Sequence, residues 1–169
     1  MLDHPAASIP AAEDRALTLH DLDPAEHLLV FGLRAIAVGH GDCPTLAHTF
    51  TRRCGPMGAP ALQAYFTLLK LIGMSSRRRL QVHVPGCACV SVDETAVVGV
   101  VAAAQAAVKG GDDSLLRMRL GFLTRSEAGE VLRQTAQALA RALLAGGEAS
   151  PMRIETGPAP ATARLMTVH

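Results

Sequence analysis

The chain has 169 residues, of which 49% are hydrophobic and 18% charged, and its formal net charge is +1. This composition supplies enough apolar surface for the core of one domain. Aromatic residues are scarce, with no Trp, one Tyr and four Phe, and this suits helix packing better than a β-sandwich. We therefore predict an all-α fold, a single compact bundle of about six helices with a short extended segment before a Cys-x-Cys turn.

The ends of the chain differ from its middle in composition. The N-terminal stretch has acidic residues among Ala and Pro, and it does not show the basic start and apolar stretch that are typical of a signal or transit peptide. We therefore predict a cytoplasmic protein. Pro, Ala, Thr and Gly dominate the C-terminal stretch. We predict a flexible segment over 1–22, a helical domain over 23–146 and a flexible tail over 147–169. In a reducing compartment, the four cysteines are expected to be free thiols or ligands rather than disulfides.

The first half of the chain carries clear helix signals. Asp23-Pro24-Ala25-Glu26 is a capping box with proline at the first helical position, and it opens a helix that ends near Val38, before Gly39. A short helix is predicted over 44–54, because Gly55 and Pro56 prevent its continuation. A third helix, over 59–74, has apolar residues at three- and four-residue spacings.

The second half begins with an alternating segment over 80–84, which predicts an extended stretch or isolated edge strand. The next helix, over 92–108, is apolar nearly all round, so we place it at the centre of the bundle. It is too short to span a bilayer, which needs about 20 apolar residues. A short helix ending near Leu120 follows, and the capping box Thr124-Arg125-Ser126-Glu127 opens a long amphipathic helix.

The charged and apolar surfaces give expectations about partners. Residues 77–79 are three arginines at the end of a helix, a pattern that favours a solvated turn over a nucleic-acid surface because no aromatic residue is interleaved. The mean hydropathy of +0.24 predicts that some apolar helix surface stays exposed after folding. We therefore expect a homo-oligomer or a protein partner.

Two thiols, Cys87 and Cys89, lie immediately before the apolar helix. Free N–H groups at a helix start favour the thiolate, the form that binds metals and attacks electrophiles. A zinc or iron–sulfur centre needs three or four ligands. His40 and Cys43 are the favoured partners, because the Gly41-Asp42 turn lets both side chains fold inward. The predicted metal site is Cys87, Cys89, Cys43 and His40.

Other interpretations of these cysteines remain open. Cys54 and His83 are alternative partners, but Cys43 and Cys54 cannot share an ion, because 11 helical residues separate them by ~16 Å. Cys87 and Cys89 could instead form a redox-active pair, which would react before Cys54, or the cysteines could simply pack in an Ala-rich core. His27 is expected to be a solvated first-turn residue.

The order of the elements, with Pro85, Cys87 and Cys89 before an Ala-rich helix, resembles a small uncharacterised bacterial family of unknown function. The resemblance covers about residues 28–145 and implies no activity.

Function is predicted from the thiols and from the apolar helices. The sequence contains no convergent acid, base and nucleophile, so we assign no catalytic or cofactor-binding residue and favour a role other than catalysis. We predict a small regulatory or binding protein that holds a metal or iron–sulfur centre, or senses redox, through the Cys-x-Cys pair. The alternative is a non-catalytic adaptor that binds a protein partner through an apolar helix face, with the cysteines only packing.

Overall fold

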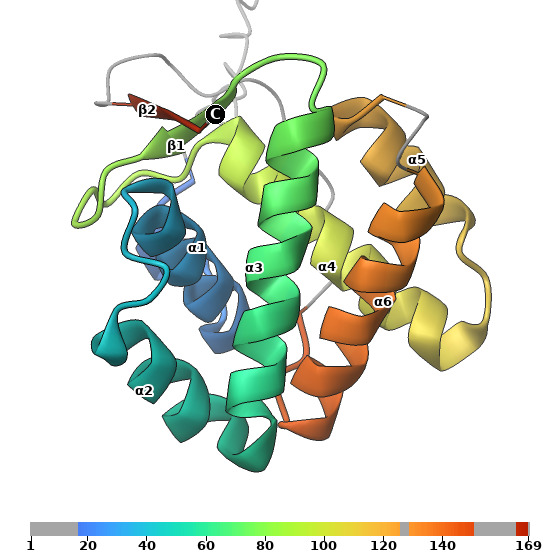
Figure 1. Cartoon of the computed structure of the whole chain (residues 1–169), viewed down its shortest axis with the longest axis horizontal. Helices are drawn as coiled ribbons and strands as arrows, with labels where there is room; N and C mark the ends of the chain where they lie inside the picture. Colours follow the sequence, from blue (N-terminus) through green and yellow to red (C-terminus); the bar gives the residue numbers. More distant parts are fainter. Residues whose placement is uncertain (1–16, 126–128, 151–164, 169) are drawn as a thin grey trace, which may run out of the picture.

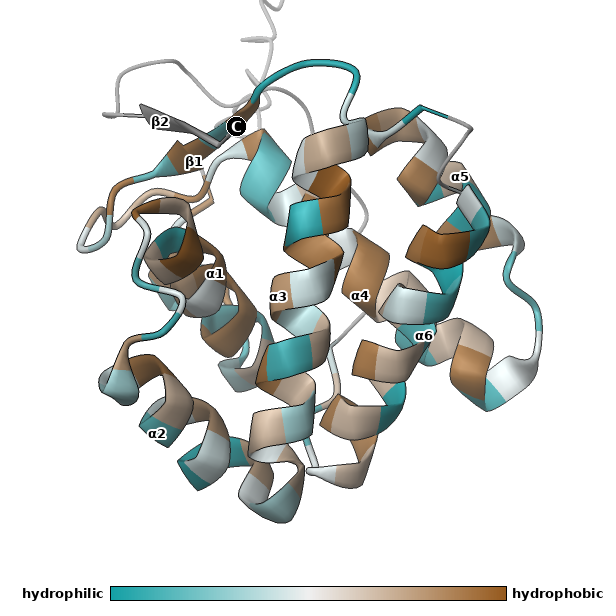
Figure 2. Ribbon diagram, in the orientation of Figure 1, coloured by the Kyte–Doolittle hydropathy of each residue, from teal (hydrophilic) through white to brown (hydrophobic). Residues whose placement is uncertain are grey.

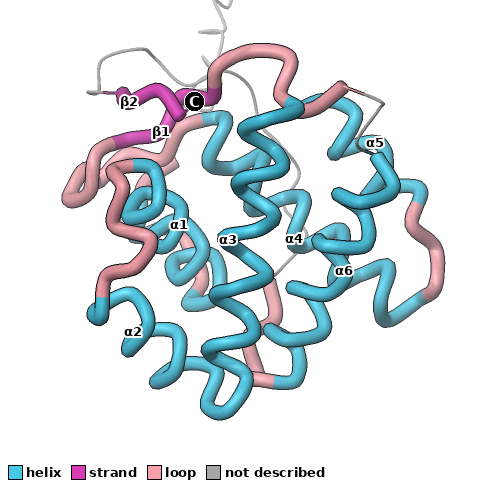
Figure 3. Tube along the Cα trace, in the orientation of Figure 1, coloured by secondary structure: helices cyan, strands magenta, loops and turns pink. Residues whose placement is uncertain are grey.

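Helices account for most of the residues that the computed structural model describes, which are 17–125, 129–150 and 165–168 (Figures 1 and 3). The all-α class predicted from the sequence is confirmed. The helices are α1 (Pro24–Ala37), α2 (Pro44–Cys54), α3 (Gly58–Ser75), α4 (Val92–Gly110), α5 (Ser114–Leu123) and α6 (Gly129–Ala145), with 3-10 turns at Leu19–Asp21 and Gly55–Met57. Within these residues, no helix is long and apolar enough to cross a membrane.

Where the structure describes them, several helices begin and end at the predicted capping residues and glycines. The Asp23 carboxylate accepts a hydrogen bond from the Glu26 amide at 2.8 Å, and the Glu26 carboxylate accepts one from the Asp23 amide at 2.9 Å. Gly111 ends α4 in the left-handed conformation, with φ 78°, which glycine adopts without strain. Two residues of the capping box predicted at 124–127 lie outside the described residues.

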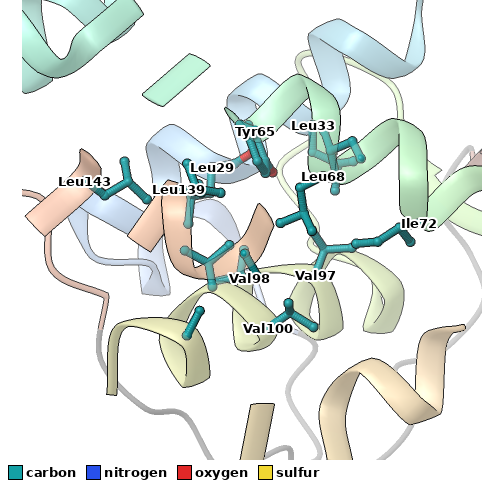
Figure 4. Packing of buried hydrophobic residues seen from close by; sticks show 14 of the residues in the cluster. Leu29, Leu33, Tyr65, Leu68, Ile72, Val97, Val98, Val100, Leu139 and Leu143 are labelled. Carbon is teal, nitrogen blue, oxygen red and sulfur yellow. The ribbon is translucent and has the colours of Figure 1, made fainter. Parts of the chain in front are cut away.

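The core forms around α4, which packs against α1, α5, α6 and the strand before it. Val100 and Val101 of α4 are fully buried. Figure 4 shows Val97 and Val98 of this helix facing side chains of α3 and α6. The hydrophobic stretches of the helices appear brown in Figure 2. The helix predicted to be central therefore contributes buried residues around most of its circumference.

The short extended segment is paired rather than isolated, which corrects the sequence-based expectation. Strand β1 (Leu80–His83) pairs antiparallel with β2 (Leu165–Val168), with Leu80 opposite Val168. These partners are separated by more than 80 residues, so local alternation in the sequence could not reveal the pairing. Residues 165–168 lie in the predicted tail, yet they form the second strand of this ribbon.

Residues 17–22, predicted to be flexible, are held against the loop that precedes α4. The Leu19 amide donates to the Ala88 carbonyl at 2.8 Å, and the Val90 amide donates to the Leu17 carbonyl at 2.8 Å. This correction concerns only the end of the predicted segment, because residues 1–16 lie outside the described residues. Much of the predicted tail, residues 151–164 and 169, also lies outside them.

Candidate functional site

A buried arginine of α1 holds the Cys-x-Cys loop. The Arg34 side chain is 4% exposed, and its Nε and Nη2 donate to the two carboxylate oxygens of Glu94 at 2.7 and 3.0 Å. Its Nη1 donates to the Cys87 carbonyl at 2.6 Å, and Nη2 also donates to the Cys89 carbonyl. The loop is therefore fixed through its backbone carbonyls, whatever its thiols bind.

Glu94 is the fully buried partner of this arginine. Its carboxylate also accepts hydrogen bonds from the Ser91 amide at 2.8 Å and the His83 amide at 3.1 Å. The Ser91 hydroxyl in turn accepts from the Glu94 amide at 3.1 Å, so the glutamate completes a capping box. One carboxylate thus joins the start of α4 to β1 and α1, and its charge is matched by a guanidinium.

The local sequence pattern does not reveal this ion pair. Acidic residues in the first turn of a helix are expected for capping alone, and they do not indicate a partner 60 residues away. The available signal was Arg34 itself, a lone charge within the apolar residues of α1 between Leu28 and Val38. A cation on the buried face of a helix requires a paired anion.

The four cysteines occupy different environments, and all are free. Cys43 is half-buried at the N-cap of α2, and Cys54 is buried at the end of the same helix. Cys87 and Cys89 are half-buried in the loop before α4. Ser91, not a cysteine, caps that helix. The thiol placed at a helix start is therefore Cys43.

The predicted metal ligands are not assembled into a recognisable centre. In the ranges that the structure describes, no three His, Cys, Asp or Glu side chains form a group that could hold a metal ion. This applies to the set Cys87, Cys89, Cys43 and His40 and to the alternative partners Cys54 and His83. Metal binding by these residues stays a prediction.

Two of the four predicted metal ligands, His40 and Cys43, line a cavity of about 340 Å³, which we call the apolar pocket. It lies where α1 and the start of α2 meet the turn before Cys87. Figure 3 shows the loop between α1 and α2 and the loop between β1 and α4 beside α1. Its lining residues are Leu19, His27, Val30, Phe31, Arg34, Ala35, His40, Cys43, Thr45, Leu46, Pro85 and Gly86. Cys87 and Cys89 are not among them.

The polar groups at this pocket are few. His27 and His40 are exposed, whereas the Arg34 guanidinium is already occupied by Glu94 and the loop carbonyls. The histidine expected to be merely solvated thus lines a cavity. The sequence feature that could have indicated this position is the helical spacing of His27, Phe31 and Arg34. This spacing places an exposed and a buried polar residue on one face of α1.

The thiol at this pocket differs electrostatically from the one at the other end of α2. Hydrogen bonds from the backbone amides of Thr45 and Leu46, and then from the Thr45 hydroxyl, lower the pKa of Cys43 below the usual thiol value. Burial raises the pKa of Cys54, and the nearby Glu148 carboxylate adds to that rise. Cys43 is therefore more readily ionised than Cys54.

His83, the alternative metal ligand, is buried on β1. Burial lowers the pKa of its imidazole, an effect that Glu94 opposes and Arg34 reinforces. Its Nδ1 has no hydrogen-bond partner among the described residues. The imidazole is consequently neutral near neutral pH.

The fold and this site define an all-α protein with a ligand-sized apolar pocket beside a buried arginine–glutamate pair. No protein-family model, no curated protein and no solved structure matches the chain.

Proposed function

We propose that this protein is a small-ligand binding protein with a regulatory role, and that it takes a mainly apolar molecule into the apolar pocket. The observation that carries the proposal is the convergence of α1, the start of α2 and the turn Pro85–Gly86 on one cavity of about 340 Å³. Pockets that bind small molecules have volumes of roughly 300–1,000 Å³ and combine apolar walls with a few polar groups.

The chemistry of the walls indicates what the ligand should look like. Val30, Phe31 and Leu46 offer apolar contact. Because the Arg34 guanidinium is occupied, the polar side chains left for a ligand among the described lining residues are the His27 and His40 imidazoles, the Thr45 hydroxyl and the Cys43 thiol. We infer an apolar body with one hydrogen-bonding or soft electrophilic group directed at Cys43.

A regulatory role is supported by the connection between the pocket and the Cys-x-Cys loop. Pro85 and Gly86 line the pocket, and Cys87 follows directly with its carbonyl bound to Arg34. Arg34 itself lines the pocket. A ligand that displaces this turn, or an oxidation or metal-binding event at Cys87 and Cys89, would therefore act on the same buried arginine. This proposal retains the predicted redox or metal role of the thiol pair as a second input.

The pocket can be tested with the fluorescent probe 8-anilinonaphthalene-1-sulfonate. We expect saturable binding of one probe per chain, weakened at least tenfold by Ala35→Leu, which fills the pocket from α1. The same change at Ala106, an exposed residue of α4, is the control and should leave binding within twofold. Equal binding by both variants would show that the probe sits elsewhere and would contradict the proposal.

Thiol protection gives an independent measurement on the unmodified chain. Cys43 lines the pocket, whereas Cys87 and Cys89 do not. Saturating probe should therefore slow iodoacetamide labelling of Cys43 several-fold and leave the labelling of Cys87 nearly unchanged. Uniform slowing of all thiols, or none at Cys43, would count against a ligand in this cavity.

A second candidate function is self-association or binding of a protein partner through apolar helix faces. Met118 and Phe122, four residues apart on α5, are 53% and 76% exposed, and Met74 on α3 is 77% exposed. Exposed apolar clusters support an interface. Light scattering should give a mass above that of one 17.7 kDa chain, and Phe122→Ser should reduce it. A monomer at high concentration, with no co-purifying partner, would favour the ligand-binding role alone.

A further inference from the structure

A second cavity, of about 320 Å³, lies where the end of α3 meets α5 and the start of α6, at the upper right of Figure 1. Among the described residues, its lining contains four arginines, namely Arg77, Arg117, Arg125 and Arg133, and one acidic residue, Glu130. We call it the arginine pocket, and we propose that it binds the phosphate group of a small phosphorylated molecule.

Two of the arginines are neutralised within the protein. Asp113 accepts from Arg117 Nε at 2.9 Å and from Arg133 Nη1 at 3.1 Å. Glu130 accepts from Arg133 Nε at 2.9 Å. Two carboxylates therefore balance Arg117 and Arg133, and, within the part of the chain that the structure describes, the positive charge of the other two arginines remains for a ligand.

The remaining arginines are brought together by backbone pairing. Ser76 and Thr124 form an isolated antiparallel bridge, in which the Arg77 amide donates to the Leu123 carbonyl at 3.2 Å and the Arg125 amide to the Ser75 carbonyl at 2.8 Å. The two segments directly follow different helices, α3 and α5, so the pairing places two guanidinium-bearing residues at one pocket. Neither side chain has an ion-pair partner among the described residues.

Arg77 is also oriented. Its Nε donates to the Thr124 carbonyl at 3.0 Å, which fixes the guanidinium plane and leaves the terminal nitrogens available. An oriented guanidinium can donate two parallel hydrogen bonds to phosphate oxygens. Two cations that line one pocket match a dianionic phosphate monoester better than a singly charged carboxylate. A partly open cavity of this volume suits a small molecule rather than a nucleic-acid duplex.

The binding test uses calorimetry with adenosine monophosphate and with inorganic phosphate, at a salt concentration near 0.15 M. Both should bind, and adenosine, which lacks the phosphate, should not. Arg77→Gln and Arg125→Gln should each weaken binding at least tenfold. Arg79→Gln is the matched control, because Arg79 belongs to the same run of three arginines, is exposed and does not line the pocket. It should change affinity by less than twofold.

A steric variant separates loss of the site from loss of the fold. Gly121 lines the pocket, and a Cβ atom added there has no neighbouring atom within 4 Å. Gly121→Leu should therefore keep the melting temperature and the net charge but reduce phosphate binding. Three outcomes would overturn the proposal: no binding of either phosphate compound, an equal loss in Arg79→Gln, or binding of a 20-base-pair DNA duplex without binding of adenosine monophosphate.

Discussion

The two pockets use arginine in opposite ways. At the apolar pocket, Arg34 is buried and all three of its nitrogen groups are hydrogen-bonded within the protein, so the cavity wall stays apolar. At the arginine pocket, four partly or fully exposed arginines line the cavity, and Asp113 and Glu130 pair with only two of them, Arg117 and Arg133. The position of the acidic residues therefore decides whether an arginine serves the fold or remains for a ligand.

Both pockets lie on helices that share one core, and the largest expected effect is the loss of stability when a charge is placed in that core. Val100→Asp places a charge among fully buried side chains of α4 and should lower the free energy of unfolding by ~4 kcal/mol or more. Urea unfolding followed by circular dichroism measures this change. The same substitution at Val92, which is 46% exposed in the first turn of α4, is the control and should change stability by less than about 1 kcal/mol. A natively melting Val100→Asp variant would show that α4 is not central.

A second experiment compares the buried arginine of the apolar pocket with an exposed, ion-paired arginine of the arginine pocket. Arg34→Met leaves the buried Glu94 carboxylate and two loop carbonyls without their partner, so we expect a loss of about 3–5 kcal/mol. Arg117→Met removes a 68% exposed side chain from its pair with Asp113 and should cost less than about 1 kcal/mol. Urea unfolding of the two variants gives both values.

Removing both members of the buried pair sharpens this comparison. The double variant Arg34→Met, Glu94→Leu leaves no uncompensated buried charge and should be more stable than Arg34→Met alone. If Arg34→Met and Arg117→Met lose the same stability, the distinction between a buried arginine that holds the fold and an exposed arginine paired at the surface is wrong.

The sequence predicted those features that depend on neighbouring residues. Asp23 and Glu26 form the expected capping box, and α2 has the expected bounds, because proline, glycine and side-chain caps act within one helical turn. The all-round apolar character of 92–108 likewise indicated a central helix before any contact was known.

Features that depend on distant residues could not be predicted in this way. The pairing of β1 with β2 and the ion pair between Arg34 and Glu94 join positions 60 or more residues apart. For the candidate site, the turn at His40 and Cys43 and the loop before α4 were expected to meet, and Pro85 and Gly86 do line the same cavity as these two residues. The sequence could not show that Arg34 holds the loop through the Cys87 and Cys89 carbonyls, nor that these two residues do not line the cavity.

The smallest effect concerns the two thiols of α2, one at the apolar pocket and one in the core. Only the thiolate reacts with iodoacetamide, so the lowered pKa of Cys43 should allow it to reach its half-maximal rate at a lower pH than an ordinary thiol. The raised pKa of Cys54 has the opposite sign and shifts its reaction to higher pH. Near pH 7.5, mass spectrometry should therefore find Cys43 labelled several-fold faster, and the difference should shrink as the pH rises above the pKa of both groups.

In urea, where the hydrogen bonds at Cys43 and the burial of Cys54 are both lost, the two rates should converge. Faster labelling of Cys54 in the native protein would mean that the start of α2 does not stabilise the thiolate, and that the apolar pocket lacks the reactive group assigned to it.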